Sequence, residues 1–237
     1  MEAIILAGGK AERLGAAAGG RPKALVEVAG RPLAAYQVEL LARAGVDRVI
    51  VSCSAGSEKV FEAELGGLGP EIAAVGEPEP LGRGGGLRFA AAVRREEGDV
   101  LALNGDELLD ADLADLLARH RDTDAAATIV VTHPRSPYGV VELGEDDAVM
   151  GFQEADVLPV WVSCGVYALG EEALAALPER GDHETTTFPD LAERGRLHAF
   201  RHDGIWMTIN TPKDLRVADE HLRAHPDWLD SRYGAGL

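Results

Sequence analysis

Short, continuously apolar runs alternate along the first half of the chain with segments of helical periodicity. Residues 3–7 are wholly apolar, as in a central parallel strand. Between Pro32 and Gly45, apolar residues recur every three or four positions, which predicts a helix. The same patterns predict strands at 46–51, 72–75 and 99–103 and helices at 57–65, 82–95 and 111–119. This order predicts an α/β fold, a parallel sheet with helices on both faces.

The second half has a different texture, with β-rich segments joined by polar turns. The predicted segments are strands at 125–131, 139–143, 149–153, 160–169 and 197–201 and helices at 171–176, 188–193 and 212–224. They predict an antiparallel or mixed extension of the sheet. We therefore expect one domain over residues 1–237, with the second half forming one wall of a cleft.

Composition and charge exclude several classes of function. The 237 residues carry a formal charge of −17, which excludes binding of nucleic acid or an anionic membrane through the overall field. No apolar run approaches the ~20 residues of a membrane span, and no basic residue precedes the first apolar stretch, so we expect no signal peptide. Cys53 and Cys164 form no disulfide framework, which favours a reducing cytoplasm.

The charge is uneven along the chain. Residues 1–23 hold four basic and two acidic side chains, a net charge of +2 in an otherwise acidic protein. Such a basic island indicates either a local anion site or a solvated charged loop. Residues 8–22 form a long Gly/Ala-rich loop, and loops of this length in compact domains are usually functional.

Polar residues follow two of the predicted buried strands, Gly8-Gly9 after the first and Asn104-Gly105-Asp106 after the fourth. Ligands of open parallel sheets bind beyond the carboxyl ends of strands. Without Cβ atoms, the two glycines let backbone N–H groups approach phosphate oxygens. Arg13 and Lys23 add positive charge nearby.

Two common phosphate-binding patterns do not fit this loop. A Walker-type loop needs Gly-Lys-Ser/Thr, whereas Arg21-Pro22 follows Gly20. The dinucleotide fingerprint needs glycine at the positions of Lys10 and Arg13. If residues 8–22 bind phosphate, the loop therefore belongs to a different class of phosphate-binding loop.

The chain resembles the sugar-1-phosphate nucleotidyltransferases, whose signature is an L-A-G-G-x-G-x-R-L loop followed by a P-K pair and V-x-G-x-P. The matching segments are 6–14, Pro22-Lys23 and 28–32. Further matches follow in the family's order: 79–85 (E-x-P-L-G), 104–106 (N-G-D), 138–141 (Y-G-V-V), 152–154 (F-x-E), 165–167 (G-I-Y), 184–189 (E-x-x-x-F-P) and 206–212 (W-x-D-I-G-T-P). The resemblance covers residues 3–215. In its compact single-domain form, the chain is similar to the mannose- and heptose-1-phosphate guanylyltransferases.

The resemblance implies a Rossmann-like, mainly parallel mixed sheet. It also implies the formation of a nucleotide sugar and pyrophosphate from a nucleoside triphosphate and a sugar 1-phosphate, with GTP slightly favoured. Residues 1–122 would bind the nucleotide and residues 123–237 the sugar. Catalysis would rest on Arg13, Lys23 and Asp106, and the nucleotide would be bound by Leu6, Ala7, Gly8, Gly9, Lys10, Arg13, Lys23, Glu79, Gly82, Asn104 and Gly105.

The resemblance further implies a sugar site at Gly139, Glu154 and Ser163, and Mg²⁺ held by Asp106 with Thr208 as a weaker second ligand. The C-terminal segment, residues 227–237, fits either a frayed tail or a contact in a homodimer.

Five positions depart from the family pattern: Ala11, Ala155, Ser163, Thr208 and Asn210. Ala155 replaces the lysine that meets the sugar phosphate, which leaves Arg135 and Arg201 as candidate cations. Thr208 replaces the second metal aspartate, so Glu107 or water would complete the metal shell.

Three alternatives remain open. The departures fit a non-catalytic paralogue that binds nucleotide sugars, or nucleotidyl transfer to a cyclitol or amino-alcohol phosphate. Asp110 and Asp112 form an Asp-x-Asp string that could serve a metal-dependent glycosyltransferase, although such a pair before a helix is more often a cap.

Overall fold

The computed structural model of the chain describes all residues except 10, 155–156 and 230–237. Its strands are β1 (Glu2–Leu6), β2 (Glu27–Val28), β3 (Arg31–Pro32), β4 (Arg48–Ser54), β5 (Glu71–Glu77), β6 (Val100–Asn104), β7 (Glu107–Leu109), β8 (Ala127–Thr132), β9 (Val140–Leu143), β10 (Val149–Gln153), β11 (Val162–Leu169), β12 (Leu197–Arg201) and β13 (Trp206–Thr208). Its α-helices are α1 (Leu33–Arg43), α2 (Glu58–Leu65), α3 (Gly82–Ala91), α4 (Leu113–Arg121), α5 (Glu171–Ala175), α6 (Thr187–Glu193) and α7 (Pro212–Ala224).

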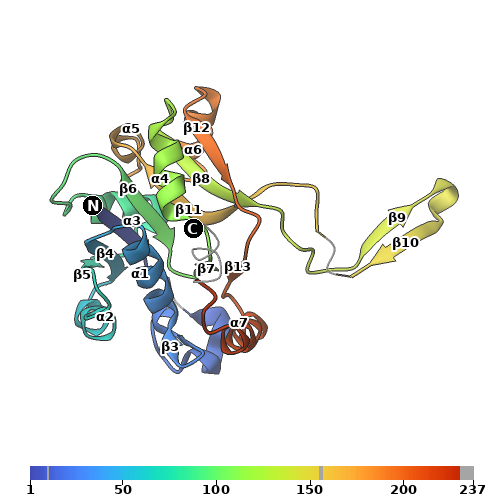
Figure 1. The fold of residues 1–237 in the computed structure, drawn as a ribbon, viewed down its shortest axis with the longest axis horizontal. Coiled ribbons are helices and arrows are strands. Elements are labelled where there is room, and N and C mark those ends of the chain that lie inside the picture. Colours follow the sequence, from blue (N-terminus) through green and yellow to red (C-terminus); the bar gives the residue numbers. More distant parts are fainter. Residues whose placement is uncertain (10, 155–156, 230–237) are drawn as a thin grey trace.

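Seven strands form the central sheet, in the order β12-β8-β11-β6-β1-β4-β5 (Figure 1). β1 lies between β4 and β6 and is parallel to both, and β4 is parallel to β5. β11 is antiparallel to β6 and to β8. The expected mainly parallel sheet with a mixed extension is therefore confirmed.

Helices pack on both faces of this sheet because successive strand residues point to opposite sides. In β1, Ala3 and Ile5 join the larger core cluster, which includes buried residues of α1, α2, α4 and α7. Ile4 joins the second cluster, with buried residues of α3, α5 and α6. The continuously apolar run seen in the sequence is thus a strand covered on both sides.

The parallel pairing of β1 and β6 brings their carboxyl ends together. Leu6 is in register with Asn104, and the Gly105 N–H donates to the Leu6 carbonyl over 2.8 Å. A Cβ at position 105 would lie 2.5 Å from that carbonyl, so only glycine fits this crossing. The two polar segments after the strands therefore lie side by side.

The hairpin of β9 and β10 stands away from the rest of the molecule (Figure 1). The two strands pair with each other and with no other described strand. We call residues 138–154 the arm. Its base consists of two segments: residues 133–137, which follow β8, and residues 157–161, which precede β11.

Several local details differ from the sequence-based expectation. The helix expected over 82–95 ends at Ala91, because the Glu2 carboxylate accepts the N–H groups of Arg95 and Glu96 and holds that segment out of a helix. The expected loop over 8–22 contains a kinked 3₁₀ segment, Glu12–Ala18. The short pairs β2–β3 and β7–β13 were not predicted, because strands of two or three residues have no periodicity to detect.

The Asp-x-Asp string has structural roles here. Asp112 is the N-cap of α4 and accepts from the N–H groups of Ala114 and Asp115, each over 3.0 Å. Asp110 is buried, accepts from the Ile205 N–H over 2.7 Å and pairs with His202 over 3.1 Å. Neither aspartate lines the cavity described below, so this geometry gives no support to a glycosyltransferase site.

None of the helices within the described residues has the length and apolar character needed to cross a membrane.

Candidate active site

A cavity of about 1000 Å³ opens where β1 and β6 end. One wall is the loop after β1, another is the start of α3, and the floor is the turn between β6 and β7. The end of β13 adds Thr208 and the segment after it adds Asn210, so the cavity takes residues from both sides of residue 122.

Most of the residues predicted to contact the nucleotide line this cavity: Leu6, Ala7, Gly8, Gly9, Arg13, Lys23, Glu79, Gly82, Asn104 and Gly105, together with Asp106. Gly9 presents an open surface, since a Cβ there would meet no atom within 4 Å, whereas a Cβ at Gly8 would lie 3.1 Å from Glu77 Oε1. Bare backbone of this kind can approach phosphate oxygens closely. Lys10 lies outside the described residues.

Lys23 is at the centre of a polar cluster on the cavity wall. Its Nζ donates to Asp106 Oδ2 over 2.5 Å and to Asn210 Oδ1 over 2.7 Å. Arg13 Nη2 donates to the same Asn210 oxygen over 2.6 Å. One neutral carbonyl therefore holds two cations close together, which is a suitable receptor for a polyanion.

The side-chain amide of Asn210 is oriented by Thr208. Asn210 Nδ2 donates to Thr208 Oγ1 over 2.8 Å, which turns Oδ1 toward Lys23 and Arg13. The backbone N–H of Asn210 also donates to Asp214 in the capping box of α7. Thr208 and Asn210, which both depart from the family pattern, are therefore joined by a hydrogen bond that orients the Asn210 amide.

This cluster offers oxygen ligands to a hard cation such as Mg²⁺. Asp106 supplies a carboxylate, Asn210 an amide oxygen and Thr208 a hydroxyl, and Mg²⁺ prefers such oxygens and keeps several waters. Among the described residues there is no group of three or more His, Cys, Asp or Glu side chains placed to hold a metal. The donor set fits a cation that is also bound by phosphate, and it does not fit an all-protein metal cage.

Glu107, one of the groups expected from the sequence to complete the metal shell, lines the cavity and is buried beside Asp106. Burial and the neighbouring Asp106 carboxylate raise the pKa of Glu107 to about 9, so the side chain is neutral at pH 7. Its Oε2 accepts from Trp206 Nε1 over 2.8 Å, across the β7–β13 pair. Gly165, at φ +69°, leaves room for it, because a Cβ there would lie 2.9 Å from Glu107 Cγ.

The opposite end of the cavity is built around the start of α3. Glu77 accepts from the Ser52 hydroxyl over 2.9 Å and from the Leu81 N–H over 3.1 Å, which fixes the entry to the helix. Arg83 lines the cavity and forms ion pairs with Asp182 and Glu184.

Close packing holds α3 to the loop of residues 178–183. A methyl group at Gly84 would lie 2.7 Å from Pro178 Cγ and 2.8 Å from the His183 nitrogen, and one at Gly85 would lie 2.7 Å from the Glu179 carbonyl. Gly84 and Gly85 are therefore required by their close contact with the loop.

His183 is fully buried beneath this contact. Its ring packs edge-on against Tyr167 and Phe188, and neither ring nitrogen has a hydrogen-bond partner. Burial lowers the pKa of His183 to about 4, so it stays neutral at pH 7. The hydroxyl of Tyr167, whose ring packs on His183, donates to Glu184 over 2.9 Å.

The residues predicted for the sugar site are not gathered at the cavity. Gly139 and Glu154 lie on the arm, and Ser163 lies in β11, where its hydroxyl accepts from the Gly165 N–H. None of the three lines the cavity, and neither do the candidate cations Arg135 and Arg201. Ala155 lies outside the described residues.

Three cavity residues were missed by sequence reasoning as functional positions: Glu77, Arg83 and Asn210. Glu77 lies two residues beyond the strand predicted at 72–75 and ends β5 in the structure, so its place after a strand could have identified it. In the sequence Asn210 stands out only as a departure from the family pattern, because its contacts with Arg13 and Lys23 span 197 and 187 residues.

Comparison with known proteins gives a consistent result. The family model described as "Nucleotidyl transferase" matches residues 2–225. Mannose-1-phosphate guanylyltransferase catalytic subunit beta of Danio rerio is 34% identical over 251 residues, covering 97% of this chain and 70% of that protein.

Solved structures are similar in fold. HddC from Yersinia pseudotuberculosis, complexed with GMP-PN, has a TM-score of 0.71 at 23% identity, covering 93% of this chain and 99% of that one. The inositol-1-phosphate CTP transferase from T. maritima has a TM-score of 0.72 at 20% identity, covering 95% and 96%.

Proposed function

Because the chain belongs to the nucleotidyl transferase family, we propose that it joins a nucleoside triphosphate to a sugar 1-phosphate, forming a nucleotide sugar and releasing pyrophosphate. An oxygen of the sugar phosphate attacks the α-phosphorus, and the bond from the α-phosphorus to the pyrophosphate oxygen breaks. Both reactants are polyanions, so catalysis depends on positioning and on neutralising charge.

One observation carries the proposal: Arg13 and Lys23 share the Asn210 carbonyl beside the Gly8–Gly9 backbone, with the Asp106 carboxylate in contact. Bound triphosphate would replace the neutral carbonyl as the partner of both cations. Arg13 and the loop amides would hold the departing phosphates, and Lys23 would neutralise charge growing at the α-phosphate.

We propose that Mg²⁺ is the cofactor, held by Asp106 together with phosphate oxygens and the neutral oxygens of Asn210 and Thr208. When bound, Mg²⁺ would neutralise and orient the phosphates. Lys23 contacts Asp106 directly in this structure, so its transfer to phosphate would free the carboxylate. We therefore expect Mg²⁺ to bind weakly without nucleotide and firmly with it.

For the substrates, we propose guanosine triphosphate and mannose 1-phosphate, supported by the name of the Danio rerio relative. On the acceptor side, Ala155 supplies no cation, and Gly139, Glu154 and Ser163 lie outside the cavity. We place the reaction in the cytoplasm, consistent with free, buried Cys53 and Cys164.

The test is pyrophosphate release with each of the four common nucleoside triphosphates against a panel of hexose 1-phosphates. The highest kcat/KM is expected with GTP and mannose 1-phosphate, and no release without Mg²⁺. Release only with a cyclitol or amino-alcohol phosphate would change the acceptor but keep the transferase. Tight binding of GDP-mannose with no release from any pair would identify a non-catalytic binder.

A further inference from the structure

The arm and its base together carry most of the large apolar side chains that the described structure leaves exposed. Nine of the twelve exposed large hydrophobic residues fall between residues 138 and 161, whereas Val60, Val93 and Val217 are scattered elsewhere. Scattered apolar residues are normal on a soluble protein, but a contiguous patch marks an interaction site.

The strand register gathers four of them on one face. Val141 is opposite Phe152, and Leu143 is opposite Val149, with exposed fractions from 47% to 64%. Val141 and Leu143 are two apart in β9 and therefore point to the same side. The irregularity between Val149 and Gly151 in β10 keeps their partners Val149 and Phe152 on that side as well, so these four form one surface, the apolar arm face. The other face carries Glu142 opposite Gly151 and Gln153 opposite Val140.

A two-stranded hairpin with one apolar face is marginally stable by itself in water. The arm also leaves the outer edges of both strands without a neighbouring strand among the described residues. Something must therefore cover this face and these edges in solution.

The base of the arm directs it away from the body. Arg135 forms a β-bridge with Val157, and the Leu158 N–H donates to the Pro134 carbonyl over 2.9 Å. The ring of His133 contacts the carbonyl oxygens of residues 158 and 160 and lies tilted against the Trp161 ring, with 3.8 Å between centroids. Folding the arm back onto its own cavity would break these contacts, so we favour a second molecule as the occupant.

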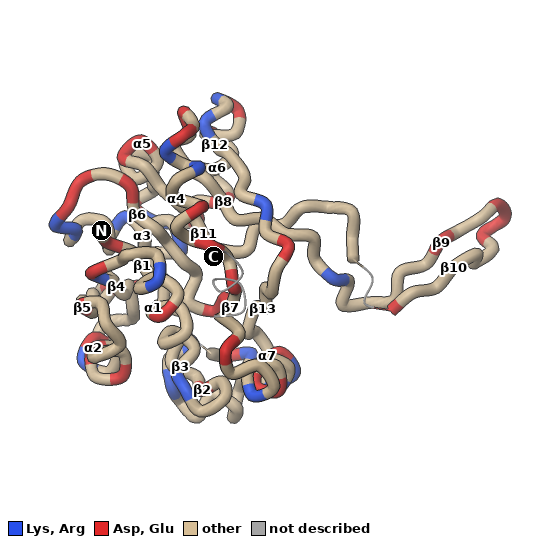
Figure 2. The backbone as a smooth tube through the Cα atoms, viewed as in Figure 1, with Lys and Arg blue, Asp and Glu red and all other residues tan. Residues whose placement is uncertain are grey.

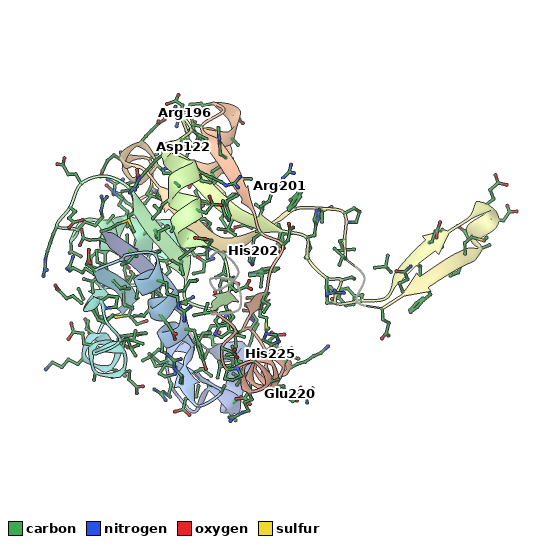
Figure 3. The ribbon with its side chains drawn as sticks, in the orientation of Figure 1. Asp122, Arg196, Arg201, His202, Glu220 and His225 are labelled. Carbon is green, nitrogen blue, oxygen red and sulfur yellow. The ribbon has the colours of Figure 1, made fainter. Side chains whose placement is uncertain are left out.

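Charge along the arm selects the kind of second molecule. The tip carries Glu145, Asp146 and Asp147, all exposed (Figure 2). Arg135 in the base is exposed, and so is Arg201 of β12, which lies beside the base (Figure 3). The Arg201 guanidinium lies over the Trp161 ring at 5.2 Å, which holds it at the base. Two arms lying antiparallel would place each acidic tip beside the partner's basic base, whereas a parallel pair would bring two acidic tips together.

We propose that the arm is a dimerisation element: two copies of this chain associate through the apolar arm faces, with the arms antiparallel. The interface is isologous, so each substitution acts twice. Association is measured without substrate, so this inference and the proposed transferase activity succeed or fail separately.

The first test is the molar mass in solution, by light scattering and sedimentation equilibrium across a dilution series. The unmodified chain is expected to be a dimer. Leu143→Glu with Phe152→Glu buries four carboxylates per dimer and should weaken association at least about tenfold, with the unfolding temperature of the body unchanged.

Two control variants match this test. Gln153→Glu adds a charge on the opposite arm face, and Val60→Glu adds one at an exposed apolar residue of α2. Both should remain dimeric. A monomeric unmodified chain, or a dimer unaffected by the double substitution, would overturn the proposal.

Cross-linking tests the antiparallel arrangement. Cys53 and Cys164 are fully buried, and burial raises the pKa of each thiol to about 12, so introduced cysteines react first. Mixing Ala148→Cys chains (tip) with Pro137→Cys chains (base) should give a tip-to-base disulfide under mild oxidation. Efficient cross-linking of Ala148→Cys chains to one another, with none to Pro137→Cys chains, would mean a parallel pair and refute the arrangement.

Discussion

At the phosphate-loop end of the cavity, Lys23, Asp106 and Asn210 hold one another through charge and hydrogen bonds. At the α3 end, Gly84 and Gly85 hold the loop of residues 178–183 through close packing. Ionic partners can be exchanged for a ligand at little cost, while packed backbone cannot move without strain. Substitutions at the phosphate-loop end should therefore alter turnover, and substitutions at the α3 end should alter stability.

Lys23→Ala should have the largest effect on turnover. If the ammonium neutralises charge at the α-phosphate, kcat should fall about 10²–10³-fold, as when one preorganised electrostatic contact is lost. Steady-state pyrophosphate release measures kcat, and thermal unfolding checks that the body is intact. A folded Lys23→Ala chain with near-normal kcat would remove this lysine from the mechanism.

Gly84→Ala should act in the opposite way, on stability. The added methyl group would be forced against Pro178 and the His183 backbone, so the free energy of unfolding should fall by about 1–3 kcal/mol. Urea unfolding measures it. An unchanged midpoint would show that the loop gives way easily and that the two ends do not differ as described.

His183 should make the packed end sensitive to acid. Its pKa in the folded protein is about 4, below the unfolded value near 6.5, so the unfolded chain binds the proton more readily between these values. Stability should fall as pH falls through this window, by about 2 kcal/mol from pH 7 to pH 5 for this residue. His183→Phe should remove that part of the loss in urea unfolding at the two pH values, and identical pH slopes for the two proteins would contradict it.

Gly9→Ala should have the smallest effect of the four substitutions, and it should separate ligand binding from stability most clearly. The methyl group meets no protein atom within 4 Å, so stability should stay within about 0.5 kcal/mol. It would stand where phosphate approaches the backbone, so the Kd for nucleoside triphosphate should rise about tenfold. Isothermal titration measures this Kd, and unchanged affinity would place the phosphates elsewhere in the cavity.

The sequence was sufficient for the elements that carry a strong local pattern. The apolar run at residues 3–7 predicts β1, and the polar residues after it and after β6 predict where the cavity lies. Both inferences depend only on short-range periodicity and on the geometry of parallel strands.

What could not be predicted depends on contacts between distant residues. β7 and β13 are three residues long and pair Glu107 with Thr208, a contact without any local signal. The neutrality of Glu107 comes from tertiary burial, which composition does not reveal. Asn210 gains its importance from Arg13 and Lys23, whose positions follow only once the sheet is assembled.

The hydrogen bond from Trp206 to Glu107 also gives the protein an optical property. It fixes an indole directly behind a cavity-lining side chain, while Trp161 lies exposed at the arm base and Trp228 is buried against Tyr36. Indole emission depends on the polarity around the ring. Each tryptophan therefore reports on a different region, and single-tryptophan variants would separate ligand entry at the cavity from association of the arms by fluorescence alone.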